Sequence, residues 1–372
     1  MTIETLVPDD PSVASVGGES REFAAWQRSL QRQLAKVPAM YDVMTTAEIL
    51  EAVSLVRERA AMSQRIVETR SGPHLLRVRP VLGPAGDTHA VQLWMGPASV
   101  SPPVLGPAVG AIWDLDSQTI AVPSGIVELA GVAPEEYTPR MSIAELFHRV
   151  STFDRHGEVL DLLYDPKPGA KLQFEAAITD GAGCPSRWRI SMRAREDQRG
   201  RGAWWLIEDI TSPDHPAQAP GLERVGLREA HRRAGTRLAV VQLAHGAISH
   251  WLTDPAPWIR WDYLFSPRDV FHPDDRARLV TLSDQVSTGY AAGIVVRTLN
   301  YDGGYTPTSL LVYPYPGYSR QPLAIVQFVH AAPGSPLSTP ASRTVWQVRD
   351  RTSPVGYDDQ LRARWGRGSR SL

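Results

Sequence analysis

The sequence has a single cysteine, Cys184, among 372 residues. One thiol excludes an internal disulfide, a CxxC redox pair and any zinc or iron–sulfur site built from several cysteines. No stretch approaches the roughly 18 apolar residues that a membrane-spanning helix needs, and residues 1–20 lack the basic and apolar regions of a signal peptide. These absences predict a cytoplasmic protein with no membrane partner.

Lysine is scarce, so arginine supplies nearly all of the positive charge. The 39 basic residues are balanced by 40 acidic residues, which argues against nucleic acid as a partner. The segment Leu222–Arg237 concentrates arginines, but it also carries Glu223 and Glu229 and lacks the pattern of a recognition helix. We therefore interpret it as a solvated helix.

The sequence also lacks the common catalytic motifs. It contains no GxxxxGKS/T phosphate loop, no strand-linked GxGxxG, no GxSxG elbow, no HExxH zinc motif and no kinase or nucleotide-cyclase signature. These absences predict a protein that is not an enzyme. An enzyme with an unfamiliar site is the weakest alternative.

Three segments share one layout, in which an alternating strand and a glycine-containing turn precede two further strands. The segments are residues 64–96, 172–211 and 293–331. They follow helical stretches at residues 46–61, 142–164 and 273–289. In the second segment apolar and polar residues alternate, which predicts one apolar face and one face exposed to solvent. The repeat predicts an α+β fold of three tandem modules, each an antiparallel sheet with helices on one face.

Stretches rich in proline, glycine and serine mark the expected boundaries. We expect a disordered N-terminus (1–20), module 1 (21–98), module 2 (107–212), a linker (213–226), module 3 (227–332) and a basic, mostly disordered tail (333–372). In module 1 the segment Arg21–Lys36 predicts an amphipathic helix where the other modules carry strands. Module 1 is therefore either truncated or built on a related but different fold.

Two short motifs resemble those of a known family. Phe271-His272-Pro273-Asp274-Asp275-Arg276 resembles a helix start common in PAS sensor domains, and Ile207-Glu208-Asp209-Ile210-Thr211 resembles the end of the last PAS strand. GAF domains have a related sheet, so both PAS and GAF stay open for module 1. The whole chain resembles the actinobacterial, mycobacterial-type proteins that join tandem PAS/GAF-like domains without an output domain. This resemblance implies a sensor in signal transduction that binds ligands or proteins.

The first motif also has an explanation that needs no ligand. Pro273 suits the first position of a helix, and Asp274 and Asp275 place negative charge at the positive end of the helix dipole. We interpret His272 as a structural residue, and a direct role in ligand binding is the weaker alternative.

Five histidines are conceivable haem ligands, because one imidazole in an apolar pocket is sufficient. They are His148, His156, His245, His250 and His272. A lone histidine is more often a surface or core group, and Cys184 lies in a turn between strands, not on a helix beside a flavin as light-sensing PAS domains require. We predict no haem, no flavin and no metal.

Tryptophan is enriched, with eleven residues, and core packing is its ordinary explanation. The alternative is that some of these residues line a ligand cavity between sheet and helices. The candidate wall residues are Trp113, Phe174, Trp188 and Met192 in module 2, and Trp261, Val296, Val312 and Phe328 in module 3. Trp204 and Trp205 are adjacent in a strand and face opposite ways, so one of them lies on the outer face and both are interface candidates.

The leading hypothesis is a non-catalytic cytoplasmic sensor or adaptor, in which an unknown small molecule or a protein of a signalling pathway changes the packing between modules. Its rival is a purely structural scaffold for protein–protein interaction with solid cores. Sensor modules of this kind often dimerise, which suggests a homodimer, although no heptad run would drive one.

Overall fold

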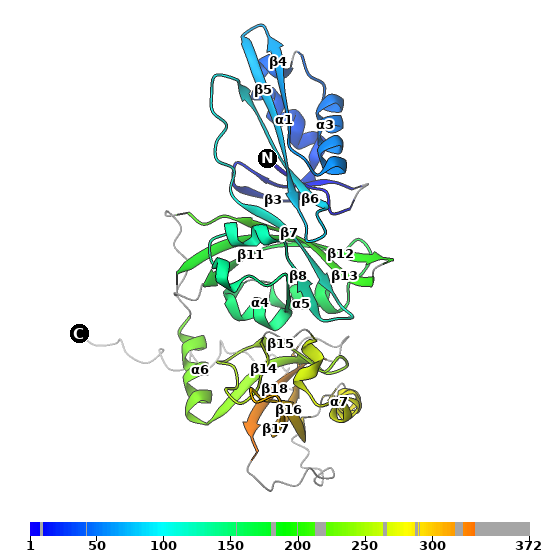
Figure 1. Cartoon of the computed structure of the whole chain (residues 1–372), viewed down its shortest axis with the longest axis vertical. Coiled ribbons are helices and arrows are strands. Elements are labelled where there is room, and N and C mark those ends of the chain that lie inside the picture. The colour runs from blue at the N-terminus through cyan, green and yellow to red at the C-terminus, as the bar shows by residue number, and fades with distance from the viewer. Residues whose placement is uncertain are drawn as a thin grey trace, which may run out of the picture.

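The computed structural model describes residues 1–7, 10–41, 43–153, 155–179, 184–198, 200–212, 221–262, 266–286, 289, 291–316 and 323–331. Three antiparallel sheets with helices divide the chain into unit 1 (residues 1–97), unit 2 (108–212) and unit 3 (222–331), which follow one another along the long axis (Figure 1). The α+β class predicted from the sequence is confirmed. Among the described residues, no helix has both the length and the apolar character needed to cross a membrane.

Unit 1 is a six-stranded sheet with three helices. Its elements are β1 (Thr2–Glu4), β2 (Ser12–Val16), β3 (Glu19–Ala25), α1 (Trp26–Ala35), α2 (Pro38–Tyr41), α3 (Thr46–Arg59), β4 (Ser63–Thr69), β5 (Gly72–Leu82) and β6 (Thr88–Pro97). The strands lie in the order β3-β2-β1-β6-β5-β4. Because β1 pairs with both β2 and β6, it lies in the middle of the sheet.

The N-terminal residues form strands, which corrects the predicted disorder of residues 1–20. Main-chain pairing holds β1 between two neighbours, and Ile3 is buried in the core of unit 1. The helix predicted over Arg21–Lys36 begins only at Trp26, because the residues before it pair with β2 as strand β3. The first strands of unit 1 therefore precede the helix.

Helix α3 begins where its local sequence predicts. Thr45 and Glu48 form a capping box, in which each side chain accepts a hydrogen bond from the main chain of the other residue. The helix then buries Ile49, Val53 and Val56 against the sheet. These three residues recur at helical spacing, so one stripe of α3 covers the apolar face of unit 1.

Unit 2 has a seven-stranded sheet in the order β10-β11-β12-β13-β7-β8-β9. Its strands are β7 (Ala108–Asp114), β8 (Thr119–Ala121), β9 (Arg140–Ser142), β10 (Val150–Phe153), β11 (Lys171–Thr179), β12 (Pro185–Asp197) and β13 (Gly200–Asp209). Its helices are α4 (Ile143–Arg149) and α5 (His156–Tyr164), with short 3-10 helices η1 (Ser124–Glu128) and η2 (Pro134–Glu136).

Unit 3 repeats the central part of this sheet with five strands. Its elements are α6 (Leu222–Arg233), β14 (Thr236–Gln242), β15 (Ala247–Trp251), η3 (Pro267–Val270), α7 (Pro273–Val286), β16 (Ala292–Leu299), β17 (Tyr305–Pro314) and β18 (Leu323–His330). The order β15-β14-β18-β17-β16 matches β8-β7-β13-β12-β11 of unit 2 strand for strand. In both units the first strand therefore lies next to the last.

Parts of the expected linker and tail lie outside the described residues. These parts are residues 213–220 of the linker and the whole of the tail, 333–372. Helix α6 begins at Leu222, inside the range expected to be linker.

The three units are stacked one on another (Figure 1). The sheets of units 1 and 2 face each other across a small apolar cluster that includes Leu6, Ala14 and Leu206. Helices α4 and α5 lie between the sheet of unit 2 and that of unit 3. Because the core of unit 2 includes Val240 and Leu323 of unit 3, this helical layer is covered on both sides.

Strand β12 alternates between two buried environments. Trp188, Ile190 and Met192 face the core of unit 2, which also contains the helices. The opposite face carries Arg189 and Arg193, which the alternation predicts to be exposed. Both arginines are only 4% exposed, and both donate hydrogen bonds to unit 1. The face predicted to contact solvent is covered by another unit.

The ion pair between Glu4 of β1 and Arg193 lies at the centre of this junction. Arg193 Nε donates to Glu4 Oε1 at 2.9 Å, and Arg193 Nη2 and Ser12 Oγ donate to the same oxygen. Arg193 Nη1 donates to Asp10 Oδ2 at 2.7 Å. Glu4 is fully buried; burial raises its pKa, and the positive charge of Arg193 opposes that rise. The pair thus holds a carboxylate in a place that would otherwise favour its neutral form.

Replacing Arg193 with methionine should lower the free energy of unfolding by about 3–5 kcal/mol, because Glu4 keeps its buried charge without a counter-ion. The loss should be smaller at pH 5 than at pH 8, since protonation of Glu4 at the lower pH removes its unpaired buried charge. Urea unfolding at the two pH values measures both effects.

The double variant Glu4→Gln/Arg193→Met should recover part of that loss, because no unpaired charge is left. Arg232→Met removes an exposed partner of Glu229 and should leave the free energy of unfolding almost unchanged, because water solvates both groups. Equal losses in Arg193→Met and Arg232→Met would contradict the role given to the buried pair.

Candidate functional site

The eight candidate wall residues gather in two hydrophobic cores. Trp113, Phe174, Trp188 and Met192 belong to the core of unit 2, and Trp261, Val296, Val312 and Phe328 belong to that of unit 3. Each is at most 8% exposed. The indole N–H of Trp113 donates to the carbonyl of Leu163 at 2.9 Å, and that of Trp188 to Ala130 at 2.8 Å. These indoles are thus packed and hydrogen-bonded, and none of the eight residues lines the three pockets described below.

The adjacent tryptophans of β13 face opposite sides of the sheet. Trp205 is fully buried in the core of unit 2. Trp204 lies on the other face and packs against the apolar cluster between units 1 and 2, beside Leu6 and Val81. Trp204 is thus the member of the pair that contacts another unit.

Two cavities lie at the junction of units 1 and 2. The first, the junction groove, has a volume of about 1020 Å³ and is lined by Met62, Arg79, Leu82, Gly125, Tyr137 and Arg140 among others. The second, the junction cavity, has a volume of about 810 Å³ and includes Ser15, Gln92, Glu175, Arg187, Arg189 and Glu208. Both volumes are of the size that small-molecule sites have, and each cavity takes residues from both units.

The junction groove is bordered by contacts that join the two units. Arg79 and Glu128 form an exposed ion pair across it at 4.0 Å. His89 of β6 packs on Gly110 of β7, and its Nδ1 lies 3.0 Å from the carbonyl oxygen of Trp205. A Cβ atom at Gly110 would lie 2.4 Å from that ring, so only glycine permits this approach.

The junction cavity contains the end of β13, where the second family motif lies. Ser15 Oγ of unit 1 donates to Glu208 Oε1 at 2.6 Å. Asp209 accepts hydrogen bonds from the main chain of Ala130 and Thr211, and Thr211 accepts one from Arg187. The motif therefore ties the end of the strand to its surroundings, while the cavity presents charges of both signs to a polar ligand.

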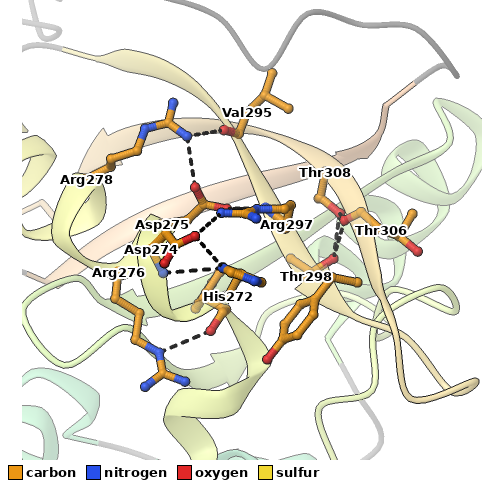
Figure 2. A network of polar contacts seen from close by, with 12 residues as sticks. His272, Asp274, Asp275, Arg276, Arg278, Val295, Arg297, Thr298, Thr306 and Thr308 are labelled. Carbon is orange, nitrogen blue, oxygen red and sulfur yellow. Dashed lines mark hydrogen bonds and ion pairs between the residues drawn. The ribbon is translucent and has the colours of Figure 1, made fainter.

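The first family motif connects helix α7 to strand β16 (Figure 2). Asp275 Oδ2 accepts hydrogen bonds from the main-chain N–H and the Nε of Arg297, both at 2.9 Å. Its Oδ1 accepts from Arg278 at 3.1 Å, and Arg278 also donates to the Val295 carbonyl. Burial alone would raise the pKa of Asp275, but the hydrogen bonds from Arg297 and Arg278 outweigh it and lower the pKa.

His272 and the threonines in the same view belong to the structure of unit 3 (Figure 2). His272 Nδ1 accepts a hydrogen bond from the Asp274 N–H at 3.3 Å, and its ring packs edge-on against Tyr305. Thr298 and Thr308 are fully buried and share a hydrogen bond of 2.6 Å. The motif residues thus position α7 on the sheet.

Asp275→Ala should lower the free energy of unfolding by about 2–4 kcal/mol, because it removes the buried carboxylate that accepts hydrogen bonds from two guanidinium groups and a main-chain N–H. Asp274→Ala is the matched control at the neighbouring position, where the side chain is 74% exposed; its cost should stay below about 1 kcal/mol. Chemical denaturation measures both values. A loss in Asp274→Ala as large as that in Asp275→Ala would contradict the structural explanation.

Three of the five histidines considered as haem ligands meet at the junction of units 2 and 3. They are His148 of α4, His156 of α5 and His250 of β15. His156 and His250 have ring centroids 5.9 Å apart, and His156 Nδ1 shares a hydrogen bond of 2.6 Å with Tyr315 Oη. His148 packs edge-on against Trp261 at 5.0 Å. Aromatic and imidazole rings thus form this part of the junction.

These histidines are held in their neutral form. Burial lowers the pKa of His250 to about 3, and the positive charge of Arg224 acts in the same direction. Burial also lowers the pKa values of His148 and His156. Desolvation of a buried imidazole favours its neutral form in this way.

Acidification should therefore weaken the folded state through His250. In the unfolded chain its pKa is about 6.5, whereas in the folded protein it is about 3. Its contribution to stability is complete above pH 6.5 and falls as the pH drops, by about 2 kcal/mol between pH 7 and pH 5. His250→Gln should remove that part of the pH dependence in chemical denaturation.

The exposed His330→Gln serves as the control and should keep the pH dependence of the unchanged protein. If the free energy of unfolding of His250→Gln depended on pH as it does in the unchanged protein, another group would be responsible.

The described part of the chain contains no group of three or more histidine, cysteine, aspartate or glutamate side chains arranged to hold a metal ion. Cys184, the single cysteine, is exposed.

Sequence reasoning missed the junction residues of unit 1. Glu4 lies in a range that was expected to be disordered, and Arg193 was expected to be exposed. A signal was present in Thr2-Ile3-Glu4, where one apolar residue lies between two polar ones, but three residues are too few to establish a period.

Comparisons with known proteins agree with this three-unit architecture. Residues 1–104 match the model of the Rv3651-like N-terminal domain, and residues 226–313 match the Rv3651-like C-terminal domain. A comparison with curated proteins gives no match. The crystal structure of an uncharacterized protein from Mycobacterium tuberculosis is similar at a TM-score of 0.71 and 20% identity, over 89% of this chain and 95% of that one.

Two further solved structures are much less similar. An RNA-binding light-oxygen-voltage receptor has a TM-score of 0.22 and 10% identity, over 60% of this chain and 95% of that one. Methyl-accepting chemotaxis protein X has a TM-score of 0.20 and 16% identity, over 61% and 75%. The mycobacterial structure shares the fold, and the two matching domain models together cover more than half of the residues. The chain therefore belongs to the Rv3651-like family.

Proposed function

We propose that the protein is a non-catalytic cytoplasmic sensor or adaptor that binds a small molecule between units 1 and 2. The observation that carries this proposal is the position of the cavities. The candidate wall residues fill the cores of units 2 and 3, whereas the junction groove and the junction cavity each take residues from two units. A ligand bound there contacts both units, so its affinity depends on how they pack.

This dependence is what a signal requires. A ligand shifts a conformational equilibrium only by the difference between its affinities for the two states. Units 1 and 2 are joined by the buried Glu4–Arg193 pair, and helix α4 of unit 2 packs directly on β15 of unit 3. A change at the first junction therefore reaches the second through one sheet and one helical layer.

We also infer that units 2 and 3 are PAS-like domains. The shared strand order, the helices that separate the first two strands from the last three, and the two motifs at α7 and β13 support this assignment. Unit 1 has the additional strand β3, and PAS-like and GAF-like both stay predictions for it. A homodimer and a protein partner from a signalling pathway stay predictions as well.

The alternative is a structural scaffold that recruits other proteins, which the packed cores favour. In this case the junction groove and the junction cavity are spaces left between rigid units and bind no specific small molecule. A sensor should therefore be stabilised by a ligand that binds in the junction groove, whereas a scaffold should not.

Filling the junction groove should abolish ligand binding there. Gly125 lines the groove, and a Cβ atom would meet only Val109 at an ordinary 3.5 Å. We expect metabolites in a thermal-shift screen to stabilise the unchanged protein, by about 2.7 kcal/mol at 100 times Kd, but not the variant Gly125→Phe.

The control Gly226→Phe places the same side chain on exposed helix α6, where a Cβ atom meets nothing within 4 Å. Every ligand that stabilises the unchanged protein should also stabilise this control variant. Ligands that stabilise both variants equally would place binding outside the groove, and a screen without any stabilising compound would favour the scaffold.

A further inference from the structure

A third pocket, with a volume of about 670 Å³, lies within unit 1. We call it the unit 1 pocket. One wall is the chain around α2, and the other is formed by the turn between β4 and β5 together with β5 and β6. Its apolar lining includes Val37, Val43, Trp94 and Met95.

The polar lining of the unit 1 pocket has one sign of charge. Lys36, Arg70 and His74 line it, and none of its described lining residues is acidic. No ion pair joins Lys36 or Arg70 to another residue in the part of the chain that the structure describes. Two cations thus border an apolar pocket without a counter-ion from the described residues.

His74 has a defined orientation in this wall. It is 5% exposed, and its Nδ1 lies 3.0 Å from the carbonyl oxygen of Gly72. Thr69 Oγ1 lies 3.3 Å from the same nitrogen. The ring is therefore fixed beside the two cations.

The indole of Trp94 forms part of the pocket because of the glycine two residues later. A Cβ atom at Gly96 would lie 2.6 Å from Cζ2 of Trp94. The glycine lets the indole lie close against the main chain of β6, where it presents a flat apolar surface. A side chain at position 96 would displace this surface.

We propose that the unit 1 pocket binds a small aromatic carboxylate. The ring packs on Trp94 and Met95, and the carboxylate meets Arg70 and Lys36, whose charges no described lining residue neutralises. Arginine suits this task because its guanidinium group donates two parallel hydrogen bonds to a carboxylate. This site lies within one unit, so it is independent of the function proposed for the junction.

Isothermal titration calorimetry of the full chain with naphthoate tests the proposal. Naphthoate should bind about tenfold or more tightly than the neutral naphthylmethanol, because Lys36 and Arg70 add to the affinity of the anion only. Arg70→Gln and Lys36→Gln should each weaken naphthoate binding about fivefold and leave naphthylmethanol unaffected. Gly96→Ala should weaken both ligands, since the indole moves.

The control Arg28→Gln removes an exposed cation of α1 in the same unit and should change neither affinity. Equal binding of naphthoate and naphthylmethanol would overturn the proposal, as would absence of naphthoate binding. An equal loss in Arg28→Gln and Arg70→Gln would also overturn it, because general attraction to a basic surface would then explain the binding. Thermal unfolding confirms that each variant is folded, and Gly125→Phe should bind naphthoate unchanged, which separates this site from the junction groove.

Discussion

The burial of a charged sheet face is the constraint on which the rest of this structure depends. Strand β12 places Arg189 and Arg193 on the side of the sheet away from its own core. Such groups leave water at tolerable cost only where acceptors of the right charge and geometry replace it. Unit 1 supplies the Glu4 carboxylate and the Gly18 carbonyl. If unit 1 were shifted by one residue along β12, these buried charges would lose their partners. The contacts therefore define how the first two units pack.

The two junctions of the stack rest on different chemistry. Units 1 and 2 are joined by ion pairs around Arg193 with a small apolar cluster beside them. Units 2 and 3 are joined by apolar side chains and neutral imidazoles, among them His250. The helical layer of unit 2 is buried from both sides, whereas the junction groove and the junction cavity lie where units 1 and 2 meet. The junction of units 1 and 2 therefore contains ion pairs and cavities, whereas the junction of units 2 and 3 contains histidines with lowered pKa values.

Much of the fold follows from local pattern. Alternation in β11 to β13, glycine-containing turns and the preceding helical stretches predict the three antiparallel sheets, because a period of two needs only neighbouring residues. The start of α7 at Pro273 follows in the same way. The central strand Thr2–Glu4 does not, since its partner in β6 lies about ninety residues later, at Gln92. Three residues carry too little pattern to reveal a strand whose neighbours are so distant.

The sequence by itself determined the class of the fold and the number of sheets. It also determined that the two adjacent tryptophans lie on opposite faces of β13. Each of these features depends on spacing along the chain. Only the tertiary structure decided that Arg193 is buried, that His148, His156 and His250 meet, and that Lys36 and Arg70 line one pocket. These outcomes depend on which surfaces cover one another. The partners are separated by up to 189 positions, and no local period encodes such a contact.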